Sequence, residues 1–353
     1  MQVEVSMPAK RYLFYISQNY SYAILRPLQE EIWARGDEAA WFLEGKEVNG
    51  NFLNSNEQRL LSIDEVQNYK PVAIFYPANI APTFLPGINV AVFHGFDAGK
   101  VDKRGNNDHF KVRNCFDLYC TQGPSTTEPF LELAEQHNHF QVAETGWCAL
   151  DYLYLDHEKP SAGKPTILLC STFSKKLSCA PHLFETVKRL SRSNKWHWLV
   201  QFHPKMPADI VKKYKSLQNE NLSFVETDDV IPLLQQADVM VCDTSSVLIM
   251  FLLLGKPVVT FNNIAPTDYL LDINSVDLLE ETIEKALLKP SELMKQIEHF
   301  ISMTHPYNDG KSSSRVLNAV DAMLSDKFAL SKKPIDFFRQ FKMRKKLKYW
   351  RFG

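Results

Sequence analysis

The stretch VMVCDTSSVLIMFLLLGKPVVTF, residues 239–261, indicates the fold class. A short run, 239–243, apolar except for its last residue Asp243, is followed by hydroxyl residues, a longer apolar run, the turn Gly255-Lys-Pro257 and a second short apolar run, 258–261. Short β-branched runs separated by a helix-length segment are typical of parallel strands whose faces are covered by helices. We therefore predict a strand, a helix that ends at Gly255, and a second strand.

The same alternation extends through most of the chain and predicts two doubly wound α/β domains. The other predicted strands are 12–16, 39–43, 72–76, 90–93, 116–120 and 140–143 in the first half, and 166–170, 196–202 and 222–225 in the second. A helix is predicted over 23–35, ending at Gly36. The polar, proline-bearing stretch 156–165 is interpreted as a linker. It separates a first domain, 1–155, from a second, 166–326, followed by a tail, 327–353, and two such domains in series predict a cleft between them.

Composition is that of an ordinary globular protein. A length of 353 residues favours two domains of roughly 150 residues each, and 45% hydrophobic with 23% charged residues excludes fibrous and disordered classes. The N-terminus is too short and polar for a signal peptide, and no stretch reaches the roughly 18 apolar residues of a membrane span. These features predict a cytoplasmic protein.

The spacing of the six cysteines indicates no zinc site, and we predict neither a metal nor a cofactor. They lie far apart, without CxxC pairs or histidines at zinc spacing, so we interpret them as reduced, buried thiols. The adjacent pair Asp228-Asp229 is interpreted as solvated surface rather than a metal site.

Ligands of open α/β sheets bind beyond the carboxyl ends of the strands, so polar residues that follow predicted strands are candidate site residues. His94 and Gly95 follow the strand 90–93. A neutral imidazole there can take a proton from an acceptor hydroxyl. The alternative is a histidine that only caps the strand.

A second polar group, His203-Pro-Lys205, follows the strand 196–202. An imidazole and an ammonium together suit a phosphate. The alternative is a surface turn.

A third group, Asp243-Thr-Ser-Ser246, stands between a strand and a helix. Hydroxyls and free backbone N–H groups at a helix start form an anion site, which favours a diphosphate. The alternative is helix capping alone.

A fourth group is the polar loop that contains Asp309 and Gly310 and leads to Arg315 in a predicted helix. Arg315 can contact a phosphate through two N–H groups. The alternative is a capped helix start with a surface arginine.

In this order, these groups resemble the CDP-glycerol glycerophosphotransferase family, the teichoic-acid primases and polymerases, whose fold is GT-B. The matching parts are His94-Gly95, Glu144-Thr-Gly-Trp147 leading to Asp151, Ser171-Thr-Phe173, His203-Pro204, Asp243-Thr-Ser-Ser246, Gly255-Lys-Pro257, and Asp309-Gly310 with Arg315. The resemblance covers most of the chain.

The resemblance implies an enzyme that transfers glycerol phosphate, or a related phosphoalditol, from a CDP-alditol to a glycan or lipid-linked acceptor. His94 and His203 are the implied catalytic residues, with His94 as the base. The implied donor-binding residues are Gly95, Thr172, Lys205, Asp243, Thr244, Ser245, Ser246, Asp309, Gly310 and Arg315. Where the family commonly has proline and arginine, this chain has Ser171 and Ser174, so one phosphate contact is missing or comes from Lys175. Thr244 stands where the family has tyrosine.

Two other function classes stay open. A sugar-nucleotide glycosyltransferase or a UDP-sugar epimerase would use the same fold. A catalytically silent module that binds a polyanionic glycan at the membrane would use the basic tail alone. Nucleic acid is not an expected partner, because the body of the chain is acidic and contains no recognised nucleic-acid module.

The charge of the chain is uneven. The net charge is −1, but residues 331–353 hold nine Lys and Arg residues against one acid. Aromatic residues alternate with these bases, which predicts a helix lying on an anionic membrane at the inner face of the cell membrane. The predicted membrane residues are Arg344, Lys345, Lys346, Lys348 and Trp350. The alternative is a helix that packs its aromatic side chains back onto the first domain.

Overall fold

The structure, a computed structural model, describes residues 8–97, 105, 107–155, 163–227, 229–245, 247–325 and 330–351. The chain forms two compact units: Met1–Tyr152 together with Thr304–Gly353, and Leu153–Met303. Most of the predicted linker, 156–165, lies outside the described residues.

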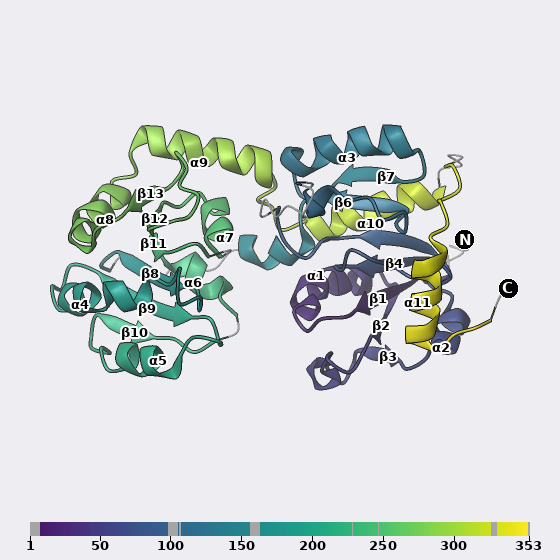
Figure 1. Cartoon of the computed structure of the whole chain (residues 1–353), viewed down its shortest axis with the longest axis horizontal. Helices are drawn as coiled ribbons and strands as arrows, with labels where there is room; N and C mark the ends of the chain where they lie inside the picture. The colour runs from purple at the N-terminus through teal and green to yellow at the C-terminus, as the bar shows by residue number, and fades with distance from the viewer. Residues whose placement is uncertain are drawn as a thin grey trace, which may run out of the picture. The chain divides into compact units, whose positions relative to one another are not determined.

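The first unit is built on a seven-stranded parallel sheet in the order β3-β2-β1-β4-β5-β6-β7 (Figure 1). The strands are β1 Arg11–Ile16, β2 Glu38–Leu43, β3 Gln58–Leu60, β4 Ala73–Tyr76, β5 Ile88–Ala91, β6 Leu118–Thr121 and β7 Gln141–Glu144. Alternate side chains of β1 enter different cores, Tyr12 and Phe14 on one face of the sheet and Leu13 and Tyr15 on the other. Both faces are therefore buried, which explains why the strand is continuously apolar in sequence.

Helices cover both faces of this sheet. They are α1 Ser21–Ala34, η1 Gly50–Phe52, α2 Ile63–Tyr69, η2 Asp108–Phe110, α3 Pro124–His137, η3 Cys148–Tyr154, α10 Ser312–Ser325 and α11 Phe337–Leu347. The predicted end of α1 is confirmed, because Gly36 has φ +79° just beyond it.

The return of the chain to the first unit corrects the predicted domain boundary at residue 326. Val316, Leu317 and Val320 of α10 are buried in the same core as Tyr12, and α10 packs against α1 (Figure 1). Apolar residues of α10 thus fill a core whose other buried members lie between residues 12 and 148, and no local pattern reveals this long-range contact.

The second unit repeats the arrangement with a six-stranded parallel sheet in the order β10-β9-β8-β11-β12-β13. The strands are β8 Thr166–Ser171, β9 His197–Phe202, β10 Leu222–Phe224, β11 Val239–Cys242, β12 Val258–Phe261 and β13 Leu271–Ile273. The helices are α4 Ala180–Leu190, α5 Ala208–Lys215, α6 Ile231–Gln236, α7 Val247–Leu253, η4 Val276–Leu278, α8 Leu279–Leu287 and α9 Ser291–Thr304. Gly255 has φ +67° after α7, as predicted.

The doubly wound fold class is confirmed, and two short strands are additional to the prediction. β3 and β13 have three residues each, too few to show a period of two. All six cysteines are free and buried, as predicted. Across the described ranges, none of the helices combines the length and the apolarity needed to cross a bilayer.

Candidate active site

Each sheet has one place where the strand order reverses, between β1 and β4 in the first unit and between β8 and β11 in the second. At such a switch point the loops beyond the two strands turn in opposite directions and leave a crevice for a ligand. Thr172 follows β8 and Asp243 follows β11. Two of the predicted site residues therefore stand at the switch point of the second unit.

Asp243 holds the loop that follows β8. Its carboxylate is fully buried and accepts hydrogen bonds from Ser171 Oγ (2.6 Å), the Cys179 backbone N–H (2.9 Å) and the Thr172 backbone N–H (3.1 Å). A buried carboxylate must be bonded in this way to remain in the interior. Its oxygens are thus engaged by the protein, and Asp243 fixes the loop 172–179 instead of presenting a free charge to a ligand.

His203 is a hydrogen-bond donor in this geometry. The Lys205 backbone N–H donates to His203 Nδ1 at 3.0 Å, so the proton of the neutral ring is on Nε2. Partial burial and, secondarily, Lys205 lower the pKa of His203, which favours this neutral form. An exposed Nε2–H can donate a hydrogen bond to a phosphate oxygen, whereas a nitrogen that already carries a proton cannot take one from an acceptor hydroxyl.

The loop after β8 also brings an aromatic ring beside His203. The ring centroids of Phe173 and His203 are 4.7 Å apart, and Lys205 Nζ lies 5.6 Å from the Phe173 centroid. Phe173 is 40% exposed. Phe173, the neighbour of Thr172 in the chain, thus lies beside His203 and Lys205. The prediction quoted Phe173 in a motif but gave it no role.

The hydroxyl residues after β11 are only partly described. Thr244 Oγ1 accepts a hydrogen bond from the Ile264 backbone N–H at 3.1 Å, which leaves the hydroxyl hydrogen free to donate. The Ser245 carbonyl accepts from the Leu248 backbone N–H at 3.3 Å as α7 begins. Ser246 lies outside the described residues.

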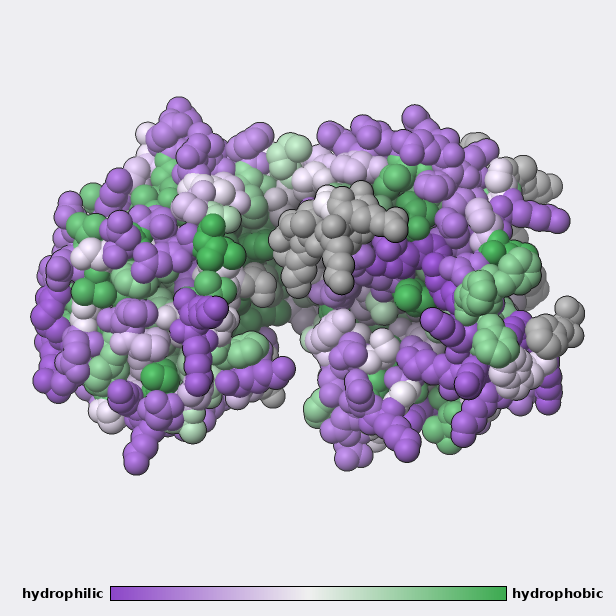
Figure 2. Space-filling model, viewed as in Figure 1, coloured by the Kyte–Doolittle hydropathy of each residue, from purple (hydrophilic) through white to green (hydrophobic). Residues whose placement is uncertain are grey.

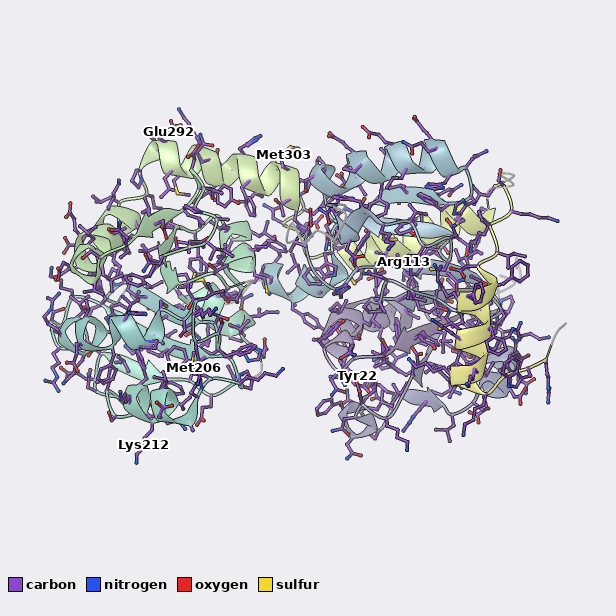
Figure 3. All side chains as sticks on the ribbon, in the orientation of Figure 1. Tyr22, Arg113, Met206, Lys212, Glu292 and Met303 are labelled. Carbon is purple, nitrogen blue, oxygen red and sulfur yellow. The ribbon has the colours of Figure 1, made fainter. Side chains whose placement is uncertain are left out.

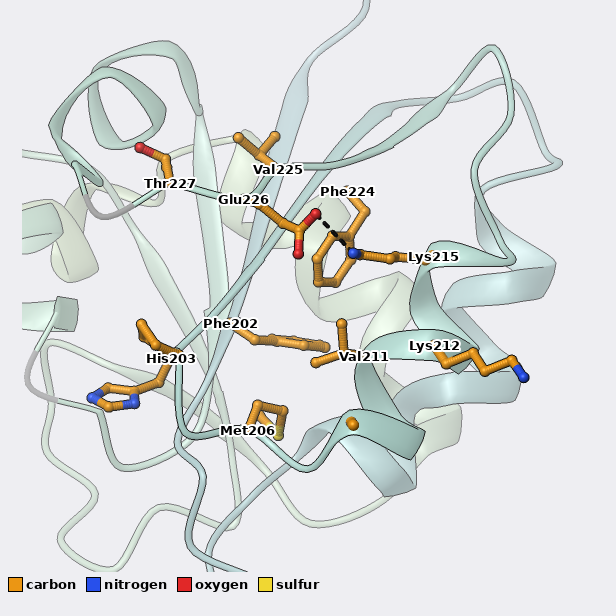
Figure 4. A pocket seen from close by; sticks show the side chains of 12 residues that line it. Phe202, His203, Met206, Val211, Lys212, Lys215, Phe224, Val225, Glu226 and Thr227 are labelled. Carbon is orange, nitrogen blue, oxygen red and sulfur yellow. Dashed lines mark ion pairs between the residues drawn. The ribbon is translucent and has the colours of Figure 1, made fainter.

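A pocket of about 860 Å³ opens beside His203, between β9, β10 and α5 (Figure 4). Apolar side chains of Phe202, Met206, Val211 and Phe224 line it. Figure 3, which labels Met206 and Lys212, shows where this pocket lies in the whole chain. Lys212, Lys215 and Glu226 stand at its polar side, and Lys215 pairs with Glu226 at 2.7 Å. No sequence prediction included this pocket, because its lining comes from three separate segments.

In the first unit, the backbone immediately before His94 is in a rare conformation. Phe93 has φ +59°, a region that bulky residues seldom occupy. Its ring is held by stacking on His109 (5.1 Å) and by an edge contact with Phe130 (5.5 Å). Strain of this kind persists where packing enforces it and occurs often at functional sites.

The orientation of His94 makes it a candidate base. Its Nδ1 lies 3.0 Å from the carbonyl oxygen of Pro77, the residue after β4. A carbonyl can only accept, so Nδ1 carries the proton and the Nε2 lone pair is left free. Tyr20, which follows β1 and is 49% exposed, has its ring 6.0 Å from that of His94.

The chain beyond His94 is tied to the returning segment. The Gly95 carbonyl accepts from Gln122 Nε2 at 2.9 Å, and Phe96 contacts the rings of Trp147 (5.4 Å) and His305 (6.4 Å). The buried His305 accepts from the Trp147 backbone N–H through Nε2 at 2.9 Å. Burial lowers the pKa of His305 to about 4, so the ring is neutral.

Asp309, Gly310 and Arg315 lie in the first unit, whereas the prediction placed them in the donor domain with His203. Arg315 forms a two-pronged ion pair with Asp309, at 3.1 and 2.5 Å, and stacks 4.1 Å above the ring of Tyr307. The guanidinium that was predicted to contact a phosphate is thus engaged by a carboxylate of its own loop. Gly310 has φ +64°, which this turn requires.

Asp151, at the end of the motif that starts with Glu144-Thr-Gly-Trp147, has a structural role. It is buried and accepts the backbone N–H groups of Ser312 and Ser313, both at 2.8 Å. It therefore caps the N-terminus of α10 from a segment 160 residues earlier. Gly146 lies in the same contact, where an added Cβ would stand 2.5 Å from Ser312 Oγ.

Within the described ranges, no group of three or more His, Cys, Asp or Glu residues is placed to hold a metal ion. Asp228 lies outside those ranges, and Asp229 Oδ1 accepts from the Ile231 backbone N–H at 3.0 Å at the start of α6.

The family described as CDP-Glycerol:Poly(glycerophosphate) glycerophosphotransferase matches residues 183–322. Over these residues the chain is similar to that family. The matched part contains His203, Asp243 and Arg315, and it confirms the resemblance stated from the motifs. The match supports an activity of the glycerophosphotransferase type. No curated protein matches the chain.

Solved structures share the fold of this chain. A variant of the wall teichoic acid polymerase TagF soaked with CDPG has a TM-score of 0.63 at 14% identity, over 90% of each chain. A putative UDP-N-acetylglucosamine 2-epimerase from Listeria monocytogenes has a TM-score of 0.62 at 14% identity, over 93% of this chain and all of the other. The S. aureus MnaA structure with UDP has a TM-score of 0.60 at 15% identity, with the same coverage. This similarity confirms the GT-B architecture.

Proposed function

We propose that the chain transfers glycerol phosphate, or a related phosphoalditol, from CDP-glycerol to a hydroxyl of a cell-surface glycan or lipid-linked acceptor and releases CMP. The acceptor oxygen attacks the phosphorus that bears the glycerol, the bond from that phosphorus to the bridging oxygen breaks, and CMP leaves with that oxygen. The acceptor proton passes to His94. Reactions of this kind depend mainly on positioning and charge neutralisation.

The observation that carries the proposal is the fixed orientation of His94. The bond from Nδ1–H to the Pro77 carbonyl (3.0 Å) leaves Nε2 unprotonated. The strained backbone of Phe93 supports this role. Its ring is packed against His109, and this packing fixes the position from which the side chain of His94 projects. The alternative of a histidine that only caps a strand would not require an exposed ring beyond a strained residue.

Donor binding is proposed for the group around His203. Its Nε2–H, the Thr244 hydroxyl hydrogen and the Lys205 ammonium are donors suited to phosphate oxygens. Thr172 precedes Phe173, whose ring contacts His203, and its backbone N–H donates to Asp243. We propose that Thr172 contributes to donor binding and that Asp243 acts by positioning. Ser245 and Ser246 remain proposed donor contacts.

The roles proposed for the returning segment are indirect. Arg315 is bound to Asp309, so a donor phosphate could reach the guanidinium only by sharing or replacing that carboxylate. We propose that Asp309, Gly310 and Arg315 mainly determine the conformation of the loop after α9. We also propose that Gly95, which has no side chain, lets the backbone continue beyond His94 without a side chain next to the imidazole.

A glycan acceptor is favoured by Tyr20. Its half-exposed ring beside His94 can cover the apolar C–H face of a sugar ring and remove that face from water. A hydroxyl of such a sugar would then approach Nε2.

The inner face of the cell membrane is the proposed place of the reaction, with the protein in the cytoplasm. The support is the basic, aromatic segment 331–353, since Lys and Arg residues are attracted to anionic lipids.

Nucleotide release is the decisive experiment. The full chain is incubated separately with CDP-glycerol, CDP-ribitol and UDP-N-acetylglucosamine in the presence of lipid-linked acceptors, and the nucleotides are separated by chromatography. We expect CMP from a CDP-alditol and acceptor mass increased by one phosphoalditol. Release of UMP or UDP, or epimerised sugar, would instead support the sugar-nucleotide alternative, and the absence of any release would support the silent binding module.

A further inference from the structure

Trp147 is partly buried and contacts the segment that carries His94, yet neither the motif nor the proposed reaction gives it a role. Its indole Nε1–H donates a hydrogen bond to the carbonyl oxygen of Phe93 at 3.3 Å. Beyond His94, the ring of Phe96 meets the indole edge-on, with the ring centroids 5.4 Å apart. Trp147 therefore contacts the chain immediately before and shortly after the candidate base.

The carbonyl that Trp147 binds belongs to the peptide bond between Phe93 and His94. A peptide unit is planar, so its oxygen and the Cα atom of the following residue turn together. A donor at this oxygen thus restricts the rotation about ψ of Phe93 that would move the Cα atom of His94. The Pro77 carbonyl restrains the other end of the residue, at imidazole Nδ1. The backbone and the ring of His94 are therefore held by two separate hydrogen bonds.

The left-handed conformation of Phe93 makes the backbone restraint necessary. At φ +59° a bulky residue relaxes to a more favourable region unless its surroundings prevent it. Stacking on His109 and the edge contact with Phe130 restrain the phenyl ring, but these contacts do not act on the carbonyl. The indole N–H supplies the restraint at that atom.

Trp147 is itself fixed by the segment that returns to the first unit. Its backbone N–H donates to Nε2 of the buried His305 at 2.9 Å. Gly146 has φ +77° and lies so close that an added Cβ would stand 2.9 Å from the same nitrogen. A side chain whose own backbone is held in this way can orient its neighbours.

The restraint at Pro77 has a different support, helix α11. The Arg344 guanidinium stacks 4.3 Å from the ring of Phe84, which lies in the loop that begins at Pro77, and Lys346 pairs with Glu44 at 2.5 Å. These two residues, predicted for the membrane, thus attach α11 to the first unit, and in Figure 2 a hydrophobic patch lies over α11 on a mostly hydrophilic surface. Loss of the Trp147 hydrogen bond should therefore leave the tautomer of the base unchanged.

We infer that Trp147 is a positioning residue for the candidate base: its indole N–H holds the peptide between Phe93 and His94 so that Nε2 of His94 meets the acceptor hydroxyl. A general base must lie within hydrogen-bond reach of the proton that it takes, and a small displacement lowers the rate steeply. The inference rests on the proposed function, which assigns His94 its role. The alternative is an indole that only packs against the core of the first unit, a purpose that a phenyl ring would serve as well.

Two variants separate the hydrogen bond from the packing. Trp147→Phe keeps an aromatic ring but loses the N–H, whereas Trp147→Gln loses the ring but keeps an N–H donor. The matched control is Trp41→Phe, which removes a buried indole N–H that donates to Gln29 Oε1 at 2.5 Å in the same unit. Nucleotide release gives kcat, calorimetry gives the Kd for CDP-glycerol, and hydrogen exchange of residues 93–97 reports the restraint on His94 without any donor.

We expect Trp147→Phe to lower kcat about tenfold, with an unchanged Kd and pH profile, because one hydrogen bond that orients the base is lost. Exchange of residues 93–97 should become about fivefold faster. Trp147→Gln should recover part of both effects, and Trp41→Phe should show neither. In the His94→Ala background, Trp147→Phe should have no further effect on the residual rate, because the residue that it positions is absent.

Wild-type kcat and exchange in Trp147→Phe would overturn the inference. So would a loss of kcat of equal size with and without His94, which indicates a merely structural effect. If Trp147→Phe does not fold, 3-benzothienylalanine at this position, which replaces only the indole N–H by sulfur, gives the same readouts. A wild type that releases no nucleotide would contradict the proposed function, whereas the exchange measurement would still decide whether Trp147 holds His94.

Discussion

His94 Nδ1 lies 3.0 Å from the carbonyl oxygen of Pro77, which joins the loop after β5 to the end of β4. This bond selects the tautomer in which Nε2 is free to accept a proton. The conformation of Phe93, with φ +59°, directs the side chain that follows. The tautomer and the orientation of His94 thus depend on two backbone features, the carbonyl of Pro77 and the conformation of Phe93.

Replacing His94 by Ala should lower kcat about a hundredfold to ten-thousandfold, because a general base acts in the transition state. Donor affinity, measured by titration calorimetry with CDP-glycerol, should be unchanged. His299→Ala, an exposed histidine of α9, is the matched control. Normal turnover by a folded His94→Ala protein would refute the assignment.

Replacing His203 by Ala should act on binding. Loss of a hydrogen bond to a charged phosphate weakens affinity about tenfold to a hundredfold, with a smaller effect on kcat. His203→Gln, whose amide can still donate, should recover part of this affinity. An unchanged Kd for CDP-glycerol in His203→Ala would show that the donor binds elsewhere.

Replacing Asp243 by Ala should destabilise the second unit by about 3 kcal/mol, because buried donors of Thr172 and Cys179 lose their acceptor. The thermal midpoint and hydrogen exchange of the loop 172–179 measure this effect. Asp268→Ala, an exposed carboxylate of the same unit, should leave both unchanged. Unaltered exchange in that loop would contradict the positioning role.

Replacing Tyr20 by Ala should raise the KM for a glycan acceptor about tenfold, through loss of buried apolar area, while hydrolysis of CDP-glycerol by water is unaffected. Tyr20→Phe keeps the ring and should behave as the wild type. Trp33→Ala, another exposed aromatic of the first unit, is the control. If Tyr20→Ala slows hydrolysis and transfer equally, the ring does not select the acceptor.

Stability should fall as the pH is lowered from about 6.5 to about 4, in part through His305. Burial, the largest cause, lowers the pKa of His305 from 6.5 to about 4 in the folded state, so only the unfolded chain gains this proton in that range. The contribution of His305 to the free energy of unfolding is present above pH 6.5. It is lost as the pH falls towards 4, by up to about 3 kcal/mol. His305→Gln, whose side-chain oxygen can accept from the Trp147 N–H, should flatten the pH dependence of the thermal midpoint relative to the wild type. A slope equal to that of the wild type would exclude His305 as its source.

Local sequence patterns predicted most of the candidate site as separate parts. His94, Thr172, His203 and Asp243 each follow an apolar strand, and in a parallel sheet this position alone puts a residue at the edge where ligands bind. The tautomers of His94 and His203 could not be predicted, because Nδ1 of His94 meets the carbonyl of Pro77, 17 positions away, whereas Nδ1 of His203 meets the nearby N–H of Lys205.

By itself, the sequence determined the two parallel sheets, the helix ends at Gly36 and Gly255 and the basic aromatic character of the tail, since all of these depend on neighbours within one strand or one helix. Only the tertiary structure decided that the chain returns to the first unit at Thr304, that Asp309 engages Arg315, and that α11 turns Arg344 inward and Phe338 outward. The return and the orientation of α11 depend on packing between residues that lie hundreds of positions apart. Hydrophobic periodicity within one segment shows that a buried face exists, but it cannot show which core that face joins.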